Sequence, residues 1–236
     1  MCAWEKYYEE KLYPLQNGVL NIVSSAKTPF FLTGGTALSR YYTCHRYSDD
    51  LDFFVVRHTG YHKFVDTILE GLIAGEGKGF FRIEHDSLSR SEAHTQLYIS
   101  ACEADEIILK IEFVNDVAQH YGELITDPLL GRVDSIRNIL SNKLTALFRS
   151  EPKDVADIYA IALEREIDWR EIVTEAKTKE AGADPDVLHD ILRSFPLEQL
   201  NRIKWIDRPD FEVFGNGLKR IAEDILYGRK SLLSAG

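Results

Sequence analysis

Long apolar runs and paired cysteines are both missing from this sequence of 236 residues. No run approaches the roughly 18 apolar residues that a membrane helix needs. The first ten residues lack the basic-then-apolar pattern of a signal peptide. The three cysteines, Cys2, Cys44 and Cys102, are odd in number and widely spaced, which argues against a disulfide framework and a zinc site. We therefore expect a cytoplasmic protein without a membrane partner.

An overall excess of positive charge is missing as well. The formal net charge is −10, which argues against a protein that coats nucleic acid through a bulk positive field. One local excess of positive charge lies between Arg132 and Lys153, where the acids are Asp134 and Glu151. Its cations are Arg132, Arg137, Lys143, Arg149 and Lys153. This stretch is where a polyanion would bind, and the alternative is a solvated helix face.

Repeats, low-complexity tracts and long Gly/Ser linkers are also lacking, and hydrophobic residues make up 44% of the chain, enough for a substantial core. Strand-like patterns stop after Asp127-Pro128, and from Ser135 onward the segments have helical periodicity. This change predicts an α+β domain over residues 1–127, with a mixed sheet and flanking helices. It predicts an all-helical domain over residues 128–236 that completes a cleft.

The expected elements follow from periodicity and from turn residues. Helices are predicted over residues 4–26, 36–42 and 61–74, and strands over residues 29–32, 50–56, 80–84, 96–100 and 106–114. A further helix begins at Ser135. Two later helices have a polar residue ahead of an early proline, Ser150 before Pro152 and Asp184 before Pro185, so we expect capping side chains there.

Asp50 and Asp52 are the first chemically informative pair. Residues two apart on a strand share a face, so both carboxylates point one way while Leu51 and Phe53 enter the core. Paired carboxylates repel unless a cation lies between them, and hard oxygen ligands of this kind suit Mg²⁺. A polar strand edge near a turn is the simpler explanation for an isolated Asp-x-Asp.

A glycine pair precedes these acids. Gly34-Gly35 at a strand-to-helix junction lets backbone N–H groups approach a phosphate, and the Thr36 hydroxyl can add a further contact. An ordinary tight turn would explain Gly-Gly-Thr alone. The combination with Asp-x-Asp about fifteen residues later is more specific.

A two-metal site needs a third carboxylate from a neighbouring strand. In the segment from Glu106 to Val114, Ile111 and Phe113 are expected in the core, which places Lys110 and Glu112 together on the opposite face. Glu112 is therefore a candidate third ligand. The alternative is a solvent-facing Glu–Lys pair on an edge strand.

A cation follows in the helical half. Lys143 lies beside the apolar stripe of the helix that begins at Ser135, where it could reach a triphosphate. Asp154 and Asp157 are three residues apart on the next helix and could orient Lys143 or Arg149. The alternative is a salt bridge between helices that binds no ligand.

These motifs resemble the nucleotidyltransferases of the AbiEii/AbiGii toxin family, a branch of the polymerase-β superfamily that includes the MenT toxins. The resemblance covers roughly residues 30–165. It is carried by the motifs Gly34-Gly35-Thr36-Ala37-Leu38, Arg46-x-Ser48-x-Asp50-x-Asp52-Phe53, Lys110-Ile-Glu112, Lys143-Leu-Thr-Ala146-Leu-Phe-Arg149 and Lys153-Asp154-x-x-Asp157-x-Tyr159. Two departures are Glu112, where many relatives have Asp, and Lys153, where the family often has Arg.

The resemblance implies a polymerase-β-type fold and a nucleotidyltransferase that uses an NTP with Mg²⁺ or Mn²⁺. It implies metal binding by Asp50, Asp52 and Glu112, catalysis by these acids with Lys143 and Asp157, and nucleotide binding by Gly34, Gly35, Thr36, Arg46, Ser48 and Lys143. It also implies an RNA acceptor such as a tRNA 3′ end, a toxin function and a cognate antitoxin. The alternatives are transfer to a small-molecule hydroxyl, as in antibiotic-modifying relatives, and a catalytically idle binding module.

Overall fold

The computed structural model describes residues 3–102 and 104–235, so Cys2 lies outside the described residues. The described chain divides into two compact units. Unit 1 comprises residues 1–37, 47–118 and 123–134, and unit 2 comprises residues 38–46, 119–122 and 135–236. The boundary expected after residue 127 stays a prediction.

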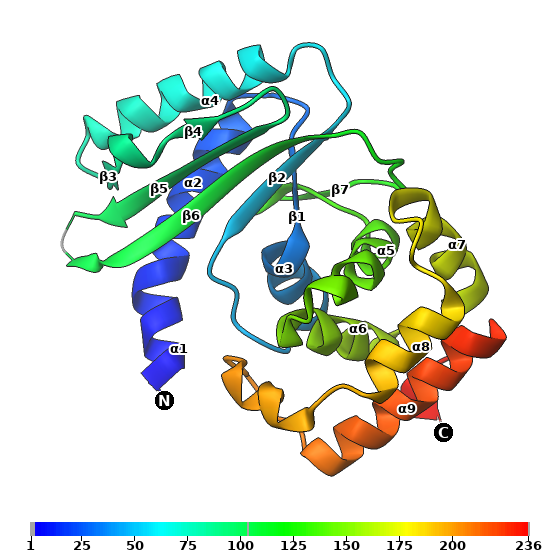
Figure 1. Ribbon diagram of the computed structural model, residues 1–236. Helices are drawn as coiled ribbons and strands as arrows, with labels where there is room; N and C mark the ends of the chain where they lie inside the picture. The colour runs from blue at the N-terminus through cyan, green and yellow to red at the C-terminus, as the bar shows by residue number, and fades with distance from the viewer. Residues whose placement is uncertain (1–2, 103, 236) are drawn as a thin grey trace. The chain divides into compact units, whose positions relative to one another are not determined.

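Unit 1 is built on one mixed sheet (Figure 1). The strand order is β3-β5-β6-β2-β1-β8-β7, and β4 pairs with β5. The β2–β6 and β1–β8 pairs are parallel, and the other pairs are antiparallel. The strands are β1 (Phe31–Thr33), β2 (Leu51–Val56), β3 (Arg82–Ile83), β4 (Ser89–Arg90), β5 (His94–Ala101), β6 (Ala104–Asp116), β7 (Ile125–Asp127) and β8 (Gly131–Val133).

The helical segments of unit 1 are α1 (Ala3–Tyr7), a π-helical turn η1 (Tyr8–Leu12), α2 (Tyr13–Ser25), α3 (Gly34–Ala37), α4 (Tyr61–Glu76) and the short η3 (His85–Ser87). The two long helices, α2 and α4, cover the apolar face of the sheet. Helix α2 crosses behind β5 and β6 in Figure 1, and its Ile22 packs closely on Gly71 and Gly75 of α4. The Tyr61 hydroxyl donates to Thr95 Oγ1 and to the backbone oxygen of Phe113, both at 2.9 Å. The core of unit 1 therefore lies between this face and the two long helices.

Unit 2 is helical. Its elements are the π-helical η2 (Leu38–Thr43), α5 (Ile136–Ala146), η4 (Leu147–Arg149), α6 (Pro152–Glu164), α7 (Trp169–Lys179), α8 (Pro185–Arg193), η5 (Leu197–Arg202), α9 (Phe211–Tyr227) and η6 (Leu233–Ala235). Two short strands, β9 (Ile167–Asp168) and β10 (Lys230–Ser231), pair antiparallel. The Ser135 side chain accepts a hydrogen bond from the Asn138 N–H and so caps α5.

The predicted α+β class, with a mixed sheet and flanking helices, is confirmed. Two of the expected helix caps are wrong. The residue before α6 is Glu151, without a side-chain cap, and Asp184 pairs with Lys177 instead of capping α8. Strands β4 and β7 to β10 were not predicted, because segments of two or three residues are too short to show alternation. No described helix is long and apolar enough to span a membrane.

Candidate active site

A row of polar side chains crosses four neighbouring strands of unit 1 at one level. Asp52 on β2 is the register partner of Glu112 on β6 and of Thr33 on β1. Gln96 on β5 is the next partner of Glu112. Partner residues on paired strands share a face, so these four side chains form one polar rung. The expectation that Glu112 lies on the strand beside Asp52 is confirmed.

The rung exists because polar and apolar residues alternate along β2. Leu51, Phe53 and Val55 are buried, whereas Asp52 is half-buried on the other face. Asp50 precedes the first residue of β2 and is also half-buried. Both carboxylates therefore lie on the side away from the apolar core, as the strand period predicts.

Gly34 begins α3 directly after β1, which confirms the glycine pair at a strand-to-helix junction. It has a positive φ of 68°, a conformation that favours glycine. A Cβ at this position would overlap Oδ2 of Asp52 and would lie 3.3 Å from its Cγ. Glycine is therefore required twice here, once by the backbone and once by the close approach of the Asp52 carboxylate.

Thr36 is placed differently from the expectation. Its side chain is fully buried, and its hydroxyl donates to the backbone oxygen of Asp50. The hydroxyl therefore supports the start of β2. Ser48, two residues before Asp50, is also buried.

Glu112 has two cationic or titratable neighbours on the same face. His94 Nε2 lies 2.9 Å from Glu112 Oε1, and Lys110 Nζ lies 2.6 Å from Oε2. Burial would raise the pKa of Glu112, but the hydrogen bonds and charges of Lys110 and His94 outweigh it and lower the pKa. The Glu–Lys pair considered from the sequence does form, but β6 is an interior strand between β5 and β2.

Lys110 balances the charge of this face. Burial disfavours its charged form, but the hydrogen bond to Glu112 and the charges of Glu112, Asp50 and Asp52 outweigh it and raise the pKa of Lys110. Three carboxylates thus act on one ammonium group. Lys110 lies on this face, as the strand period predicts, but it was not among the predicted site residues, although the same period of two relates it to Glu112.

The residues present fit the chemistry of a divalent cation. The carboxylates of Asp50, Asp52 and Glu112 offer hard oxygen ligands, and the missing Cβ of Gly34 makes room for the Asp52 carboxylate. Within residues 3–102 and 104–235, no three His, Cys, Asp or Glu side chains are already arranged around a metal position. Both oxygens of Glu112 are bound by protein groups, so Glu112 must exchange one of these bonds to become a ligand.

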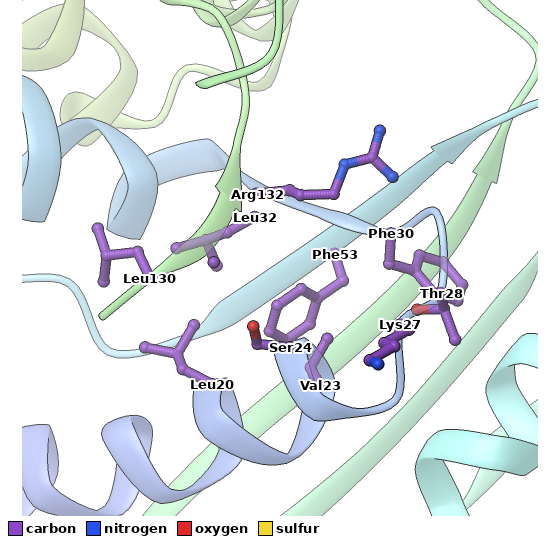
Figure 2. Close-up of a pocket in the computed structure, with 11 residues that line it drawn as sticks. Leu20, Val23, Ser24, Lys27, Thr28, Phe30, Leu32, Phe53, Leu130 and Arg132 are labelled. Atoms are coloured by element: carbon purple, nitrogen blue, oxygen red, sulfur yellow. The ribbon is translucent and has the colours of Figure 1, made fainter. Parts of the chain in front are cut away.

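A separate cavity of about 290 Å³ lies on the opposite face of the same strands (Figure 2). Leu32 and Phe53 line it, and they alternate with Thr33 and Asp52 of the polar rung. Helix α2 contributes Leu20 and Val23 to the lining. The cavity therefore belongs to the apolar side of the sheet and does not contain the carboxylates.

In unit 2, Asp157 is the centre of a buried ion-pair network. Arg46 binds it through two hydrogen bonds, Nε to Oδ1 at 2.7 Å and Nη2 to Oδ2 at 2.8 Å. Lys143 Nζ lies 2.7 Å from Oδ2, and His45 Nε2 lies 2.8 Å from Oδ1. The Asp157 side chain is 0% exposed. Burial would raise its pKa, but Arg46 and Lys143 hold the pKa of Asp157 well below its usual range.

Asp154 extends this network towards solvent. Its Oδ1 accepts from Lys143 at 2.7 Å, and its Oδ2 accepts from Arg149 at 2.9 Å. Burial would lower the pKa of Lys143, but Asp157 and Asp154 raise it. The expectation that the two aspartates orient Lys143 and Arg149 is confirmed. The salt bridge between α5 and α6 also forms, as the alternative explanation requires.

Acidic side chains neutralise most of the cations in the basic stretch between Arg132 and Lys153. Arg137 pairs with Glu175, and Lys143 and Arg149 pair with the buried aspartates. Arg132 and Lys153 are exposed and have no ion pair with any residue that the structure describes. Only two of the five cations are thus available to a polyanion without breaking a contact.

Comparison with known proteins gives a family and a fold. The family model described as nucleotidyl transferase AbiEii toxin, type IV TA system, matches residues 20–230. No curated protein matches the chain. The crystal structure of JHP933 from Helicobacter pylori is similar, with a TM-score of 0.61, 21% identity and 93% of each chain covered. MenT4, a nucleotidyltransferase toxin from Mycobacterium tuberculosis H37Rv, has a TM-score of 0.60 and 19% identity over 92% of this chain and 82% of its own.

Proposed function

Because the chain belongs to the AbiEii nucleotidyl transferase toxin family and is a nucleotidyltransferase, we propose that it transfers a nucleoside monophosphate from an NTP to an RNA hydroxyl. Pyrophosphate is the second product. The acceptor in this proposal is a tRNA 3′ end and the reaction takes place in the cytoplasm. The family is a type IV toxin–antitoxin family, which implies a cognate antitoxin.

The polar rung is the observation that carries this proposal. Asp52 and Glu112 are direct register partners, and Gly34 comes so close to Asp52 that no side chain fits between them. Acids on adjacent strands beside a half-buried glycine backbone suit a triphosphate and its counter-ion.

Asp50, Asp52 and Glu112 would hold Mg²⁺ or Mn²⁺. When bound, the metal neutralises phosphate charge and favours the deprotonated acceptor hydroxyl. The backbone at Gly34 and Gly35 binds the β- and γ-phosphates in this proposal. Lys110, which binds Glu112 on the same face, would supply positive charge to a phosphate oxygen, because an ammonium group on a flexible stem can change partners.

Three residues take positioning roles. Thr36 supports the backbone of Asp50, and Asp157 is fully buried, so neither side chain reaches a substrate directly. Arg46 is held by Asp157 in a bidentate pair and fixes the segment that leads to Ser48. The charge that Lys143 supplies to the departing pyrophosphate stays a prediction.

Transfer to a small hydroxylated molecule is the second candidate. Two observations favour it: the net charge of −10, and the pairing of Arg137, Lys143 and Arg149 with acids. An acidic protein attracts a polycationic acceptor and repels RNA.

One experiment separates the candidates. The protein is incubated with each α-labelled NTP, Mg²⁺ and total RNA, and the label is then located on a gel. Labelled tRNA supports the proposal, and tRNA whose 3′-terminal hydroxyls are chemically blocked serves as the control. Labelled small molecules from a cell extract, with unlabelled RNA, would establish the second candidate.

A further inference from the structure

The N-terminal helical segment, residues 3–25, begins outside the part of the chain that matches the family, which starts at residue 20. Two of its polar side chains, Tyr8 and Gln16, are 0% exposed. Buried polar groups of this size need partners, and here the partners lie in the segment that leads to the carboxylates.

Gln16 binds the backbone of that segment. Its Nε2 donates to the backbone oxygen of Ser48 at 3.1 Å and to that of Asp49 at 3.0 Å. The next carbonyl, of Asp50, accepts from Thr36. Three successive carbonyls are thus satisfied by buried side chains, because this segment precedes β2 and has no strand partner of its own.

Tyr8 binds the side chains of the same segment. Its hydroxyl donates to Oδ1 of Asp49, and its ring stacks on Tyr47 with centroids 4.2 Å apart and an interplanar angle of 10°. Tyr8 is also the first residue of the π-helical turn η1. Such turns widen a helix locally and frequently occur at functional sites.

We propose that Tyr8 and Gln16 are positioning residues that hold residues 47–50 so that Asp50 and Asp52 present their carboxylates to the same cation. Gln16 fixes the backbone, which sets the direction of the Asp50 side chain. Tyr8 holds the Asp49 carboxylate, which keeps a third acid in this short segment from competing as a ligand. Neither residue touches the substrate.

This inference rests on the proposed function, because it assigns a role in metal-dependent nucleotide transfer. The test uses Tyr8→Phe, which keeps the stacked ring, and Gln16→Met, which keeps the side-chain length. Tyr61→Phe is the matched control, since it removes another buried, hydrogen-bonded tyrosine hydroxyl of unit 1 on the apolar face. All variants are made in the full chain, and their thermal stability is measured first.

The main measurement is the Mg²⁺ concentration that gives half-maximal transfer. Mutation of a residue that orients metal ligands typically lowers metal affinity or activity by about 10- to 100-fold. We therefore expect Tyr8→Phe and Gln16→Met to raise the half-maximal Mg²⁺ concentration by about that factor. Saturating Mg²⁺ should restore much of kcat. Tyr61→Phe should lower the melting temperature and leave the Mg²⁺ requirement unchanged. An unchanged Mg²⁺ requirement in both Tyr8→Phe and Gln16→Met would overturn the inference.

Hydrogen–deuterium exchange tests the same idea without activity. The peptide that spans residues 47–53 should exchange faster in Tyr8→Phe and Gln16→Met than in Tyr61→Phe. If the parent protein transfers no nucleotide, the proposed function fails, and exchange alone decides the inference. Equal exchange of this peptide in all three variants then overturns it.

Discussion

Both units contain aspartate or glutamate side chains paired with cations, but the two groups differ in their access to solvent. In unit 1 the Glu112 and Lys110 side chains are 22% and 27% exposed. In unit 2 the Asp154 and Lys143 side chains are 0% and 9% exposed. An acid that acts on a substrate must be reachable, whereas a buried ion pair is stabilised only by its own partners. The same residue types are therefore accessible to a ligand in one unit and form a buried network in the other.

Asp52→Asn should have the largest effect on activity. The substitution removes one charge of the proposed metal site with little change in volume, and the loss of several kcal/mol of charge stabilisation corresponds to about a 10³-fold lower kcat. The melting temperature should stay close to that of the parent, because Asp52 is half-buried on the polar face. Steady-state kinetics and a thermal melt test both points.

Asp86→Asn, at an exposed position of unit 1, is the matched control and should be fully active. Addition of EDTA should abolish transfer by the parent protein. Full activity in EDTA would reject the metal-dependent mechanism.

Asp157→Asn should have the largest effect on stability. It leaves Arg46 and Lys143 buried without their shared carboxylate, and loss of one member of a buried ion pair costs about 3–5 kcal/mol of unfolding free energy. Urea denaturation measures this loss. Asp190→Asn, whose side chain is 82% exposed, should change the unfolding free energy by less than about 1 kcal/mol. A stable Asp157→Asn variant would contradict the structural role of this ion pair.

Acid should reduce the difference in unfolding free energy between the parent protein and Asp157→Asn. The folded-state pKa of Asp157 is lowered, so the folded chain binds fewer protons than the unfolded chain at this group. Its contribution to stability is complete above the ordinary aspartate range of about 4 and is lost as the pH falls towards the lowered pKa. The gap in unfolding free energy between the parent and Asp157→Asn should therefore narrow below about pH 4. A constant gap down to pH 2 would contradict the role of charge.

Gly34→Ala tests the close approach of backbone and acid. The left-handed backbone alone costs a non-glycine residue about 1–2 kcal/mol. The new Cβ would also displace Asp52, so we expect kcat to fall by about 10²-fold in addition to the loss of stability. Gly79→Ala is the matched control, because its φ is 76° and no atom lies within 4 Å of the added Cβ. It should lose stability and keep full activity.

Lys153→Ala should have the smallest effect. Lys153 is exposed without an ion-pair partner among the described residues, so an RNA phosphate can bind it, and its loss should reduce the salt slope of RNA binding by about one unit. Arg137→Ala should change the slope less, since Glu175 already compensates Arg137. RNA affinity that is independent of salt in the parent would favour a small-molecule acceptor.

The carboxylate face was predictable because its signals are local. A period of two along residues 50–56 and 106–114 sets which side chains face the core, and the structure keeps that alternation at Asp52 and Glu112. The glycine pair at the end of β1 is equally local. Gly34 has the positive φ that only a glycine adopts easily.

The contacts that fix this face were not predictable, because they join distant segments. Gln16 lies 32 positions before Ser48, and Arg46 lies 111 positions before Asp157. No periodicity relates such residues, and a single Tyr or Gln in a helix has no signature of its own. The engagement of the Thr36 hydroxyl by Asp50 likewise depends on how α3 packs on β2.

The parallel pairing of β2 with β6 also sets when the site can form during synthesis. Asp52 and Glu112 are partners across a span of about 60 residues, which contains α4 and β3 to β5. A ribosome adds roughly 5–20 residues per second, so the partner strand of Asp52 emerges about 3–12 s after it. Until then the growing chain holds its glycine turn and two aspartates without the third acid. A nascent chain of this nucleotidyltransferase therefore cannot assemble its full acidic rung before β6 leaves the ribosome.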